Sequence, residues 1–440
     1  MCHYIAGMSD SLFAPDYKSE PYWWLASPRP QLAAVQMPAK CDVAIVGSGY
    51  TGLAAALELA RCGRQVVVFD AEDAGWGCSS RNGGQVSSSI KPSYHELKAR
   101  HGADTALRIR REGLNALDWI DDFIRHESID CDFGRVGRYH AAHHPAAFAA
   151  LVREVKTQPK GAEVDCHVIP PSEQHKELGS DLYHGGVVYP AHASLHPGKF
   201  HQSLLDRALQ AGATVIPRCA VTAIARHTDG FRLQCARGEV QAREVIIATN
   251  GYTTALAPAL RRRIIPIGSY IIATELLDET LTRRLIPNNR VISDSRHVIF
   301  YFRLSEDRRR VLFGGRVAAS EIDPNMSALP LHRQMIRVFP ELSAVTISRS
   351  WGGFVAYTFD SLPHLGRNPD GLHYCMGYCG SGVSLAPYFG TRLAQQIMGK
   401  PEGRTALDDL HFSTRPFYTG EPWFLPAVIA TYRLRDRLKV

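Results

Sequence analysis

Two glycine-rich turns have the residue types and spacing that hold phosphate groups. The first is Gly47-Ser48-Gly49-Tyr50-Thr51-Gly52, between an apolar run that ends at Val46 and a helical run that begins at Leu53. In such a turn the first glycine makes the bend, the second lets a pyrophosphate approach the backbone, and the third lets helix and strand pack closely. The helix that follows supplies free N–H groups and the positive end of its dipole. The spacing therefore predicts a dinucleotide site that uses Gly47, Gly49, Tyr50, Thr51 and Gly52.

An acidic residue follows at the distance where such sites bind a ribose. A second apolar run, residues 65–69, closes on Asp70, eighteen residues after Gly52. A carboxylate there accepts hydrogen bonds from a ribose hydroxyl, and its charge repels a 2′-phosphate. We therefore expect Asp70 and the adjoining Ala71 to contact the cofactor. The fingerprint by itself fits both FAD and NAD.

The second turn, Gly380-Ser381-Gly382, follows an apolar strand at 373–376 and opens a helix that runs to about Ile397. A second helix N-terminus is a second place for partial negative charge. Between the two turns in the chain lies the segment "GWGCSSRNGGQV", residues 75–86, made mostly of glycine and small polar residues. So little side-chain bulk predicts a backbone that passes close to a bound group.

These turns need strands and helices to position them. Apolar strands are expected at 43–46, 65–69, 244–248 and 373–376, and helices at 53–60 and 382–397. Continuous apolar strands that alternate with helices are typical of a parallel sheet in an α/β protein. With 440 residues, the chain is longer than a single hydrophobic core usually serves, so two domains are expected.

Composition disfavours several other classes of protein. The net charge of +7 comes from short basic runs such as 261–263, without the sustained basic face that nucleic-acid binding requires. The ten cysteines are scattered, and the pair Cys375 and Cys379 has no partners at metal-site spacing, so free thiols and no metal are expected. We see neither a secretory signal nor an apolar run of about 20 residues that would span a bilayer. A cytoplasmic protein is the expectation.

With several ordered motifs in place, the chain resembles the FAD-dependent amine and amino-acid oxidoreductases of the D-amino-acid oxidase superfamily. Within it, the chain is most similar to the gamma-glutamylputrescine oxidoreductase-like group. The motifs that carry the resemblance are "DVAIVGSGYTG", "GCSSRNGGQV", "REVIIATNGYTT", "IIPIGSYIIATE", "RVLFGGR", "WGGFVAYTFDSLPHLGR" and "GYCGSGV".

The resemblance implies a Rossmann-type FAD-binding domain interleaved with a mixed-sheet, α+β substrate domain. The FAD domain would comprise 40–90, 195–262 and 346–400, and the substrate domain 91–194 and 263–345. Residues 1–39 would form an N-terminal arm and 401–440 a C-terminal tail. The FAD is expected to be non-covalent, because the position of the flavin-linking cysteine of sarcosine oxidase falls near Gly353 here.

The resemblance also assigns further residues to the cofactor. They lie in the opening segment, at the ends of later strands and at the second glycine turn: Ser79, Ser80, Arg81, Asn82, Gly83, Gly84, Gln85, Val221, Thr249, Asn250, Gly251, Gly353, Asp360, Gly380, Ser381, Gly382, Val383 and Ser384.

In this family the amine binds over the flavin, a hydride equivalent passes to flavin N5, and the imine is hydrolysed. The predicted catalytic or substrate-side residues are Gln85, Arg316, Tyr301 and Trp351, with Arg303 and Tyr357 as further candidates. Gln85 and Ser384 stand where sarcosine oxidase-like relatives have cations for a small carboxylate, so an amine with a remote carboxylate is favoured, and Arg316 is the predicted partner of that carboxylate. The strand "RVLFGGR" lacks the lysine that assists reaction with oxygen in those relatives, so the electron acceptor, oxygen or another, stays open.

Several alternatives remain at this point. A D-amino-acid or N-methyl-amino-acid oxidase or dehydrogenase fits the same motifs. An NAD-dependent dehydrogenase or a non-catalytic flavin-binding protein fits the first fingerprint. The tail "PWFLPAVIATYRLRDRLKV" either packs on its own domain or makes a peripheral membrane contact, and the oligomeric state is open.

Overall fold

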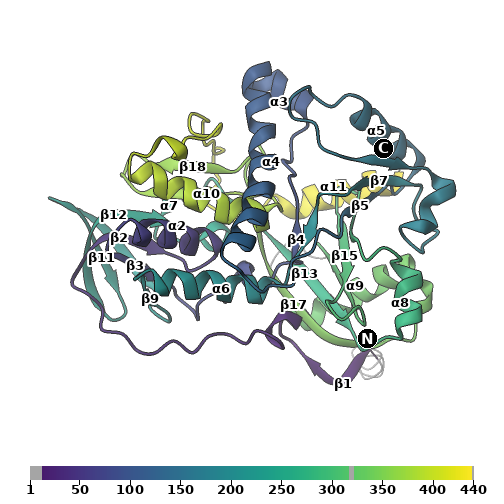
Figure 1. Ribbon diagram of the computed structural model, residues 1–440, viewed down its shortest axis with the longest axis horizontal. Coiled ribbons are helices and arrows are strands. Elements are labelled where there is room, and N and C mark those ends of the chain that lie inside the picture. The colour runs from purple at the N-terminus through teal and green to yellow at the C-terminus, as the bar shows by residue number, and fades with distance from the viewer. Residues whose placement is uncertain (1–11, 317–321, 439–440) are drawn as a thin grey trace.

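The computed structural model describes residues 12–316 and 322–438, and most of its strands form two large sheets (Figure 1). The first is eight-stranded, with the order β10-β11-β12-β2-β3-β9 and with β19 and β18 joined beside β12. Its parallel strands are β2 (Lys40–Val46), β3 (Val66–Phe69), β9 (Thr214–Ile216), β12 (Gly238–Ile247) and β19 (His373–Met376). Its antiparallel strands are β10 (Val221–His227), β11 (Gly230–Cys235) and β18 (His364–Arg367). The strands predicted from the apolar runs all lie here, and the predicted α/β class is confirmed.

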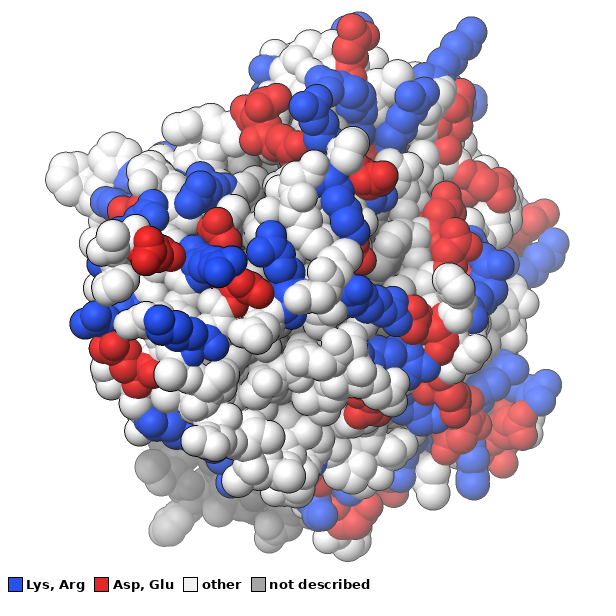
Figure 2. Space-filling view, turned by 60° about the vertical axis from the view of Figure 1, so that its left-hand side comes forward, with Lys and Arg blue, Asp and Glu red and all other residues white. Residues whose placement is uncertain are grey.

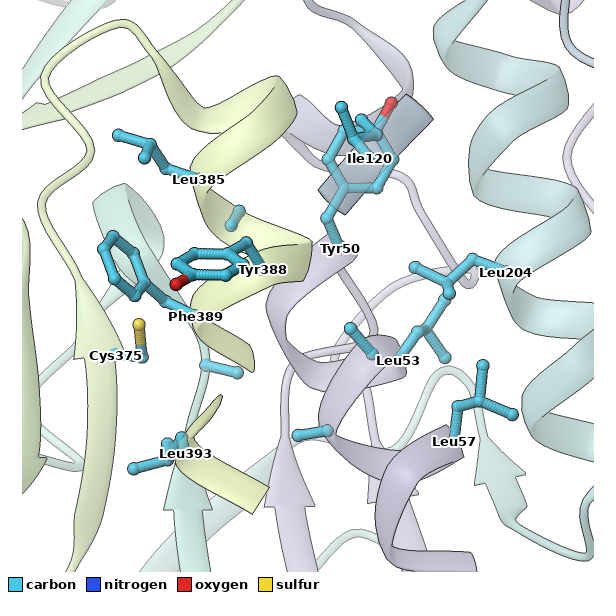
Figure 3. Close-up of a cluster of buried hydrophobic side chains, with 14 of the residues drawn as sticks. Tyr50, Leu53, Leu57, Ile120, Leu204, Cys375, Leu385, Tyr388, Phe389 and Leu393 are labelled. Carbon is cyan, nitrogen blue, oxygen red and sulfur yellow. The ribbon is translucent and has the colours of Figure 1, made fainter. Parts of the chain in front are cut away.

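Helices cover one face of this sheet. They are α2 (Tyr50–Arg61), α6 (Pro197–Gln210) and α10 (Gly382–Ile397). Alternate residues of β2 show both faces: Val43 and Ile45 pack with the helices, whereas Ala44 and Val46 pack in a second apolar cluster on the opposite face. A strand buried on both sides has to be apolar throughout, which explains the sequence of β2. Figure 3 shows the helix-side cluster, with side chains drawn from these three helices.

Two helices depart from the predicted domain division. Helices α3 (Tyr94–His101) and α4 (Ala103–His126) fall in the segment expected in the substrate domain. The buried side chains of α4, among them Ile109 and Ile120, instead join the cluster formed by α2 and α10 (Figure 3). The apolar residues of α4 recur at helical spacing on one stripe, and that stripe needs an apolar partner. This part of the chain therefore packs with the eight-stranded sheet.

The second sheet has nine strands in the order β1-β17-β13-β16-β15-β14-β5-β7-β6. Their bounds are β1 (Phe13–Lys18), β17 (Ile347–Tyr357), β13 (Ile265–Thr274), β16 (Val311–Gly315), β15 (Phe300–Leu304), β14 (Val291–Asp294), β5 (Arg138–Ala141), β7 (Gly186–Tyr189) and β6 (His167–Ile169). The remaining elements are the paired strands β4 (Gln85–Val86) and β8 (Ala193–Ser194) and the helices α5 (Pro145–Lys156), α7 (Pro258–Arg261), α8 (Glu279–Leu285), α9 (Pro324–Val338) and α11 (Leu425–Leu438).

Strand β17 belongs to the nine-stranded sheet, although it follows the predicted boundary at residue 346. The prediction assigns 346–400 to the FAD domain, but β17 is hydrogen-bonded to β13 along its length and to β1 at its start. Strand β1 comes from the predicted N-terminal arm, so residues 13–18 are also part of this sheet. The pairing of strands this far apart in sequence is not visible in local patterns. The rest of the division remains a prediction.

The C-terminal helix α11 packs on the protein itself. Its Leu425 and Ile429 are buried against Ile265 and Ile267 at the start of β13. Near its end, the Asp436 carboxylate accepts hydrogen bonds from the backbone N–H groups of residues 297 and 298, at 3.0 and 3.2 Å. These contacts support the predicted packing of the tail on its own domain.

The described surface gives no sign of a membrane span. Within residues 12–316 and 322–438, no helix has the length and apolarity needed to cross a bilayer. On the face in Figure 2, Lys and Arg side chains are interspersed with Asp and Glu. The nine described cysteines are all free thiols. The cytoplasmic location stays a prediction.

Candidate active site

A cavity of about 720 Å³ is lined by residues of both large sheets. Its size lies within the range of small-molecule and cofactor sites. The eight-stranded sheet contributes the ends of β2 and β3 and the N-termini of α2 and α10, and the nine-stranded sheet contributes residues of β5, β13, β14, β15 and β17. The predicted cofactor residues that line it are Gly47, Gly49, Tyr50, Thr51, Asp70, Ala71, Ser79, Arg81, Asn82, Gly83, Gln85, Val221, Thr249, Asn250, Gly353, Gly380, Ser381, Gly382 and Val383. Most of the predicted set is therefore brought together.

The first glycine turn has the close backbone approaches that its sequence predicts. Gly47 has φ +106°, a conformation that side chains rarely adopt. A Cβ on Gly52 would lie 2.0 Å from the Gly47 carbonyl oxygen, and a Cβ on Gly49 would lie 2.9 Å from Ser79 Oγ. Helix α2 begins directly after Gly49, which has no side chain to cap it. The turn therefore presents bare backbone and a helix N-terminus to the cavity.

Asp70 lies at the end of β3 and lines the cavity. Its Oδ2 accepts hydrogen bonds from the Ser48 N–H at 2.8 Å and the Ser48 hydroxyl at 2.5 Å, and its Oδ1 accepts one from the Glu72 N–H at 3.0 Å. Burial raises the pKa of Asp70, and these hydrogen bonds act in the opposite direction. The carboxylate is thus fixed in orientation at the place where a ribose hydroxyl is expected.

The segment 75–86 runs along the cavity wall. The Arg81 guanidinium lies 4.2 Å from the ring centroid of Trp76 and 5.1 Å from that of Trp24, and its Nη1 donates to the Gly352 carbonyl at 3.2 Å. Asn82 folds the segment back on itself, because its Nδ2 donates to the Cys78 carbonyl at 3.0 Å. A bare, internally bonded backbone is what the composition predicts.

The second glycine turn reaches the same cavity. Cys379 and Gly380 have φ +53° and +101°, and α10 begins at Gly382 without a side-chain cap on its first turn. The cavity is therefore lined by the uncapped N-termini of two helices, α2 and α10. In α2 the Tyr50 N–H donates to Ser79 Oγ at 2.9 Å. The positive dipole ends of the two helices suit a ligand that carries negative charge at two separated places. A flavin dinucleotide fits this, with a pyrophosphate near one end and a ring that gains negative charge on reduction near the other.

Several predicted residues do not line the cavity. Ser80 is buried and its hydroxyl donates to the Gly75 carbonyl at 2.6 Å, and Ser384 is buried with its hydroxyl on the Ser87 carbonyl at 2.7 Å. Gly52, Gly84 and Gly251 are packed against other residues, with Cβ positions 2.0, 2.2 and 2.9 Å from the nearest atoms. These residues shape the loops without facing the ligand.

Trp351 and Arg303, predicted as substrate-side residues, do not line the cavity. Trp351 is buried, and its indole N–H donates to the Arg81 carbonyl at 2.8 Å. Arg303 is also buried, donates to the Leu195 carbonyl at 2.8 Å and pairs with Glu306 at 3.1 Å. Trp351 is therefore a positioning residue that holds the backbone of the segment 75–86.

Asp360, predicted to contact the cofactor, is also outside the cavity lining and has a structural role. Its carboxylate accepts hydrogen bonds from the Thr358 hydroxyl at 2.9 Å, the Leu362 N–H at 3.1 Å and His364 Nε2 at 3.0 Å. Burial would raise the pKa of Asp360, but these partners outweigh it and the pKa is lowered. Asp360 therefore stabilises the folded state as a carboxylate.

We expect Asp360→Asn to lower the free energy of unfolding at pH 7 by about 1–3 kcal/mol. A lowered pKa in the folded state stabilises the fold above the unfolded value of about 3.9 and stops doing so as the pH falls through the folded value. The difference between variant and wild type should therefore shrink below about pH 4. Urea unfolding at pH 7 and near pH 3.5 measures it, and an equal difference at both pH values would contradict the assignment.

On the other side of the cavity, Tyr301 and Gln85 lie as predicted among its lining residues. The Tyr301 hydroxyl is 2.9 Å from Ser269 Oγ, and burial raises its pKa to about 12. The Gln85 amide donates to the Ile292 carbonyl at 3.1 Å.

Arg316 is paired with a tyrosine. Its guanidinium donates to the Tyr357 hydroxyl and lies 4.5 Å from the centroid of that ring. Burial alone would raise the pKa of Tyr357, but the charges of Arg316 and Lys91 together lower it. The Tyr357 hydroxyl lies 3.9 Å from the place a Cβ on Gly380 would occupy, so this pair sits beside the second glycine turn.

Sequence reasoning missed several polar lining residues, among them Lys91, Arg138, His140 and Glu154. Lys91 supplies a lysine to the cavity from outside the strand in which relatives carry theirs. Arg138 and His140 alternate with apolar residues in "RYHA", which becomes β5. That alternation of polar and apolar residues could have predicted a strand with one polar face.

Comparisons with known proteins agree with the geometry. Residues 42–396 match the family described as FAD dependent oxidoreductase (DAO). The chain is 33% identical over 405 residues to gamma-glutamylputrescine oxidoreductase of Escherichia coli, covering 91% of this chain and 94% of that protein. It is 32% identical over 418 residues to the probable oxidoreductase OrdL of Rhizobium meliloti, covering 93% and 95%.

A solved structure, glycine oxidase from Geobacillus kaustophilus, has the same fold with a TM-score of 0.72 at 21% identity, covering 86% of this chain and 99% of that one. The family match over this much of the chain, together with two helix N-termini at one cavity, favours an FAD-dependent enzyme over an NAD-dependent dehydrogenase or a non-catalytic protein. The chain belongs to the DAO family of FAD-dependent oxidoreductases.

Proposed function

We propose that the protein oxidises the C–N bond of an extended amine, a gamma-glutamyl amine or a similar compound, to an imine that water converts to an aldehyde and ammonia. The observation that carries this proposal is the cavity beyond the two glycine turns. It continues over β15, β14 and β5, where Lys91, Arg138 and Arg316 line it. A relative with 33% identity is named for a gamma-glutamyl amine. The three cationic side chains in this part of the cavity suit a substrate with a carboxylate remote from its amine.

Bound FAD would supply the acceptor for a hydride equivalent from the carbon next to the amine nitrogen. The protein's own contribution begins with the proton on that nitrogen, since an ammonium must become a neutral amine before the carbon can lose hydride. Arg316 and Lys91 disfavour a third cation nearby, which lowers the pKa of a substrate ammonium. Tyr357 accepts the proton in its phenolate form, which its lowered pKa favours, and becomes the neutral phenol.

A second candidate is the oxidation of a D-amino acid or an N-methyl amino acid. The observation in its favour is Arg316, a cation beside the second glycine turn that an α-carboxylate could pair with. Against it, the Arg316 guanidinium already bonds Tyr357, and Gln85 and Ser384 supply neutral groups whose hydrogen bonds are used within the protein.

Anaerobic reduction of the bound flavin by a panel of compounds distinguishes the two. The proposal expects bleaching by gamma-glutamyl amines and slower bleaching by unmodified diamines. Bleaching by sarcosine or D-alanine, and by no gamma-glutamyl amine or diamine, would overturn it. Admitting oxygen afterwards shows whether the reduced flavin reoxidises directly, which decides the electron acceptor.

A further inference from the structure

The end of the cavity that lies over β5 holds the Arg138 guanidinium, which forms no ion pair with any acidic residue in 12–316 or 322–438. We infer that this end binds the zwitterionic amino-acid head group of the substrate, with Arg138 on its α-carboxylate and Glu154 on its α-ammonium. The inference rests on the proposed function, because the head group in question is that of a gamma-glutamyl amine.

The pleat of β5 aims Arg138 into the cavity. Side chains alternate between the two faces of a strand, so Arg138 and His140 share one face and Tyr139 and Ala141 share the other. Tyr139 and Ala141 are buried in the apolar cluster behind the sheet, and Arg138 and His140 line the cavity. A register shift of one residue would bury the arginine among apolar side chains, so its direction is firmly set.

Part of the hydrogen-bonding capacity of Arg138 is open, although its side chain also hydrogen-bonds Tyr189. Its Nη1 donates to Ser89 Oγ at 3.2 Å, and its guanidinium lies 4.7 Å from the ring centroid of Tyr189. Its Nε is buried without a hydrogen-bond partner in the described part of the chain. Within that same part no carboxylate lies within ion-pair distance of it. Burial lowers the pKa of Arg138, as expected for a cation that is short of partners.

The surroundings favour an anion at this place. Lys91 lines the cavity nearby and acts on His140 as a like charge. Burial and the charge of Arg138 hold the pKa values of His140 and His192 at about 3 and about 2, so both rings are neutral. A carboxylate here would gain charge-assisted, bidentate hydrogen bonds from a planar guanidinium.

Glu154 gives the site its second charge. It belongs to α5, lies at the rim of the cavity and acts electrostatically on Arg138. Among the described lining residues the other acids are Asp70 and Glu72, which belong to the dinucleotide end. The Glu154 carboxylate and the Arg138 guanidinium are complementary in charge to the ammonium and the carboxylate that the substrate carries on its α-carbon.

The spacing of the strands can be compared with the length of the substrate. His140, Ser293 and Tyr301 stand in one row, because β5, β14 and β15 are adjacent and pair in that register. Two strand spacings make roughly 10 Å. In glutamate joined through its side-chain carboxyl to butane-1,4-diamine, nine bonds separate the α-carbon from the free amine nitrogen, or roughly 10 Å when extended. Arg138 lies two residues from His140 on the same face of β5, so its diagonal separation from Tyr301 is roughly 12 Å. The arginine side chain can span the difference, so a head group at Arg138 places the reacting amine near Tyr301.

A cycle of substrates and variants tests the inference. The substrates are gamma-glutamylputrescine, the analogue without the α-carboxylate, and the analogue without the α-ammonium. Wild-type holoenzyme should prefer the first over the carboxylate-free analogue by roughly 100-fold in kcat/KM. Arg138→Met should lose that preference, mostly through KM, and Arg138→Lys should keep part of it. Glu154→Gln should lower the preference in kcat/KM for gamma-glutamylputrescine over the analogue without the α-ammonium by roughly threefold.

The control is Arg153→Met, an exposed neighbour on α5 that does not line the cavity, which should behave as wild type. Flavin content and thermal unfolding of each variant identify any loss of folding, and the wild-type comparison of analogues stands without a variant. If wild type oxidises gamma-glutamylputrescine but does not discriminate against the carboxylate-free analogue, or Arg138→Met keeps the discrimination, this inference fails and the proposed function survives. If wild type oxidises none of the three, the proposed function fails.

Discussion

Gly52→Ala is expected to yield a protein that retains little FAD and unfolds at a lower temperature. The new Cβ would lie 2.0 Å from the Gly47 carbonyl oxygen and 3.2 Å from Ile45 Cγ2, so α2 would have to move away from β2. Overpacking of this kind costs about 1–3 kcal/mol or more, and it displaces the N–H groups that a pyrophosphate needs. The flavin-to-protein ratio after purification and a thermal unfolding curve measure both effects.

Gly134→Ala is the matched control. A Cβ there would meet Val136 Cγ1 at 3.6 Å, an ordinary contact, and it lies outside the cavity lining. It should retain full FAD and unfold near the wild-type temperature. A Gly52→Ala protein with full flavin content and an unchanged unfolding temperature would show that the turn is not the cofactor site described above.

Tyr357→Phe is expected to lower kcat/KM near neutral pH by roughly 100-fold and to move its rise with pH to more alkaline values. In the wild type, the phenolate of Tyr357 accepts the proton. The value of kcat/KM therefore rises as the pH passes through the lowered pKa of Tyr357 and is constant above it. Without it, the rise follows the substrate amine itself, with a pKa of about 10.4 in water. Arg316→Met should shift the rise in the same direction, because it removes a charge that lowers the pKa of Tyr357.

Tyr301→Phe is the control for this experiment. Tyr301 lines the same cavity, but burial raises its pKa to about 12, so it stays protonated over the range in question. Its loss should change the rate without moving the pH profile. An unmoved profile in Tyr357→Phe would refute the role of Tyr357 as proton acceptor.

The dinucleotide end of the site was predictable because its signals are local. Gly47, Gly52 and Asp70 belong to one continuous unit of strand β2, glycine turn, helix α2 and strand β3. The two glycines are required by the backbone geometry of the turn, and Asp70 follows at a fixed distance along the chain. The start of α10 at Gly382 was visible for the same reason.

The substrate end was less predictable because long-range pairing creates it. Arg138 and Tyr301 come to the same face of one sheet only when β5 joins β14 and β14 joins β15. Trp351 falls in a motif near the flavin of relatives, yet its strand turns the indole into the protein, toward the Arg81 carbonyl. Asp360 was misassigned because a short polar loop gives no sign of whether its carboxylate faces a ligand or its own backbone.

The most direct measurement is a single turnover without oxygen. Purified holoenzyme mixed with gamma-glutamylputrescine should lose its visible flavin absorbance, with one aldehyde and one ammonia formed for each flavin reduced. An absorbance that gamma-glutamylputrescine and other extended amines leave unchanged, while D-alanine or sarcosine bleaches it fully, would contradict the account of this cavity as a site for extended amines.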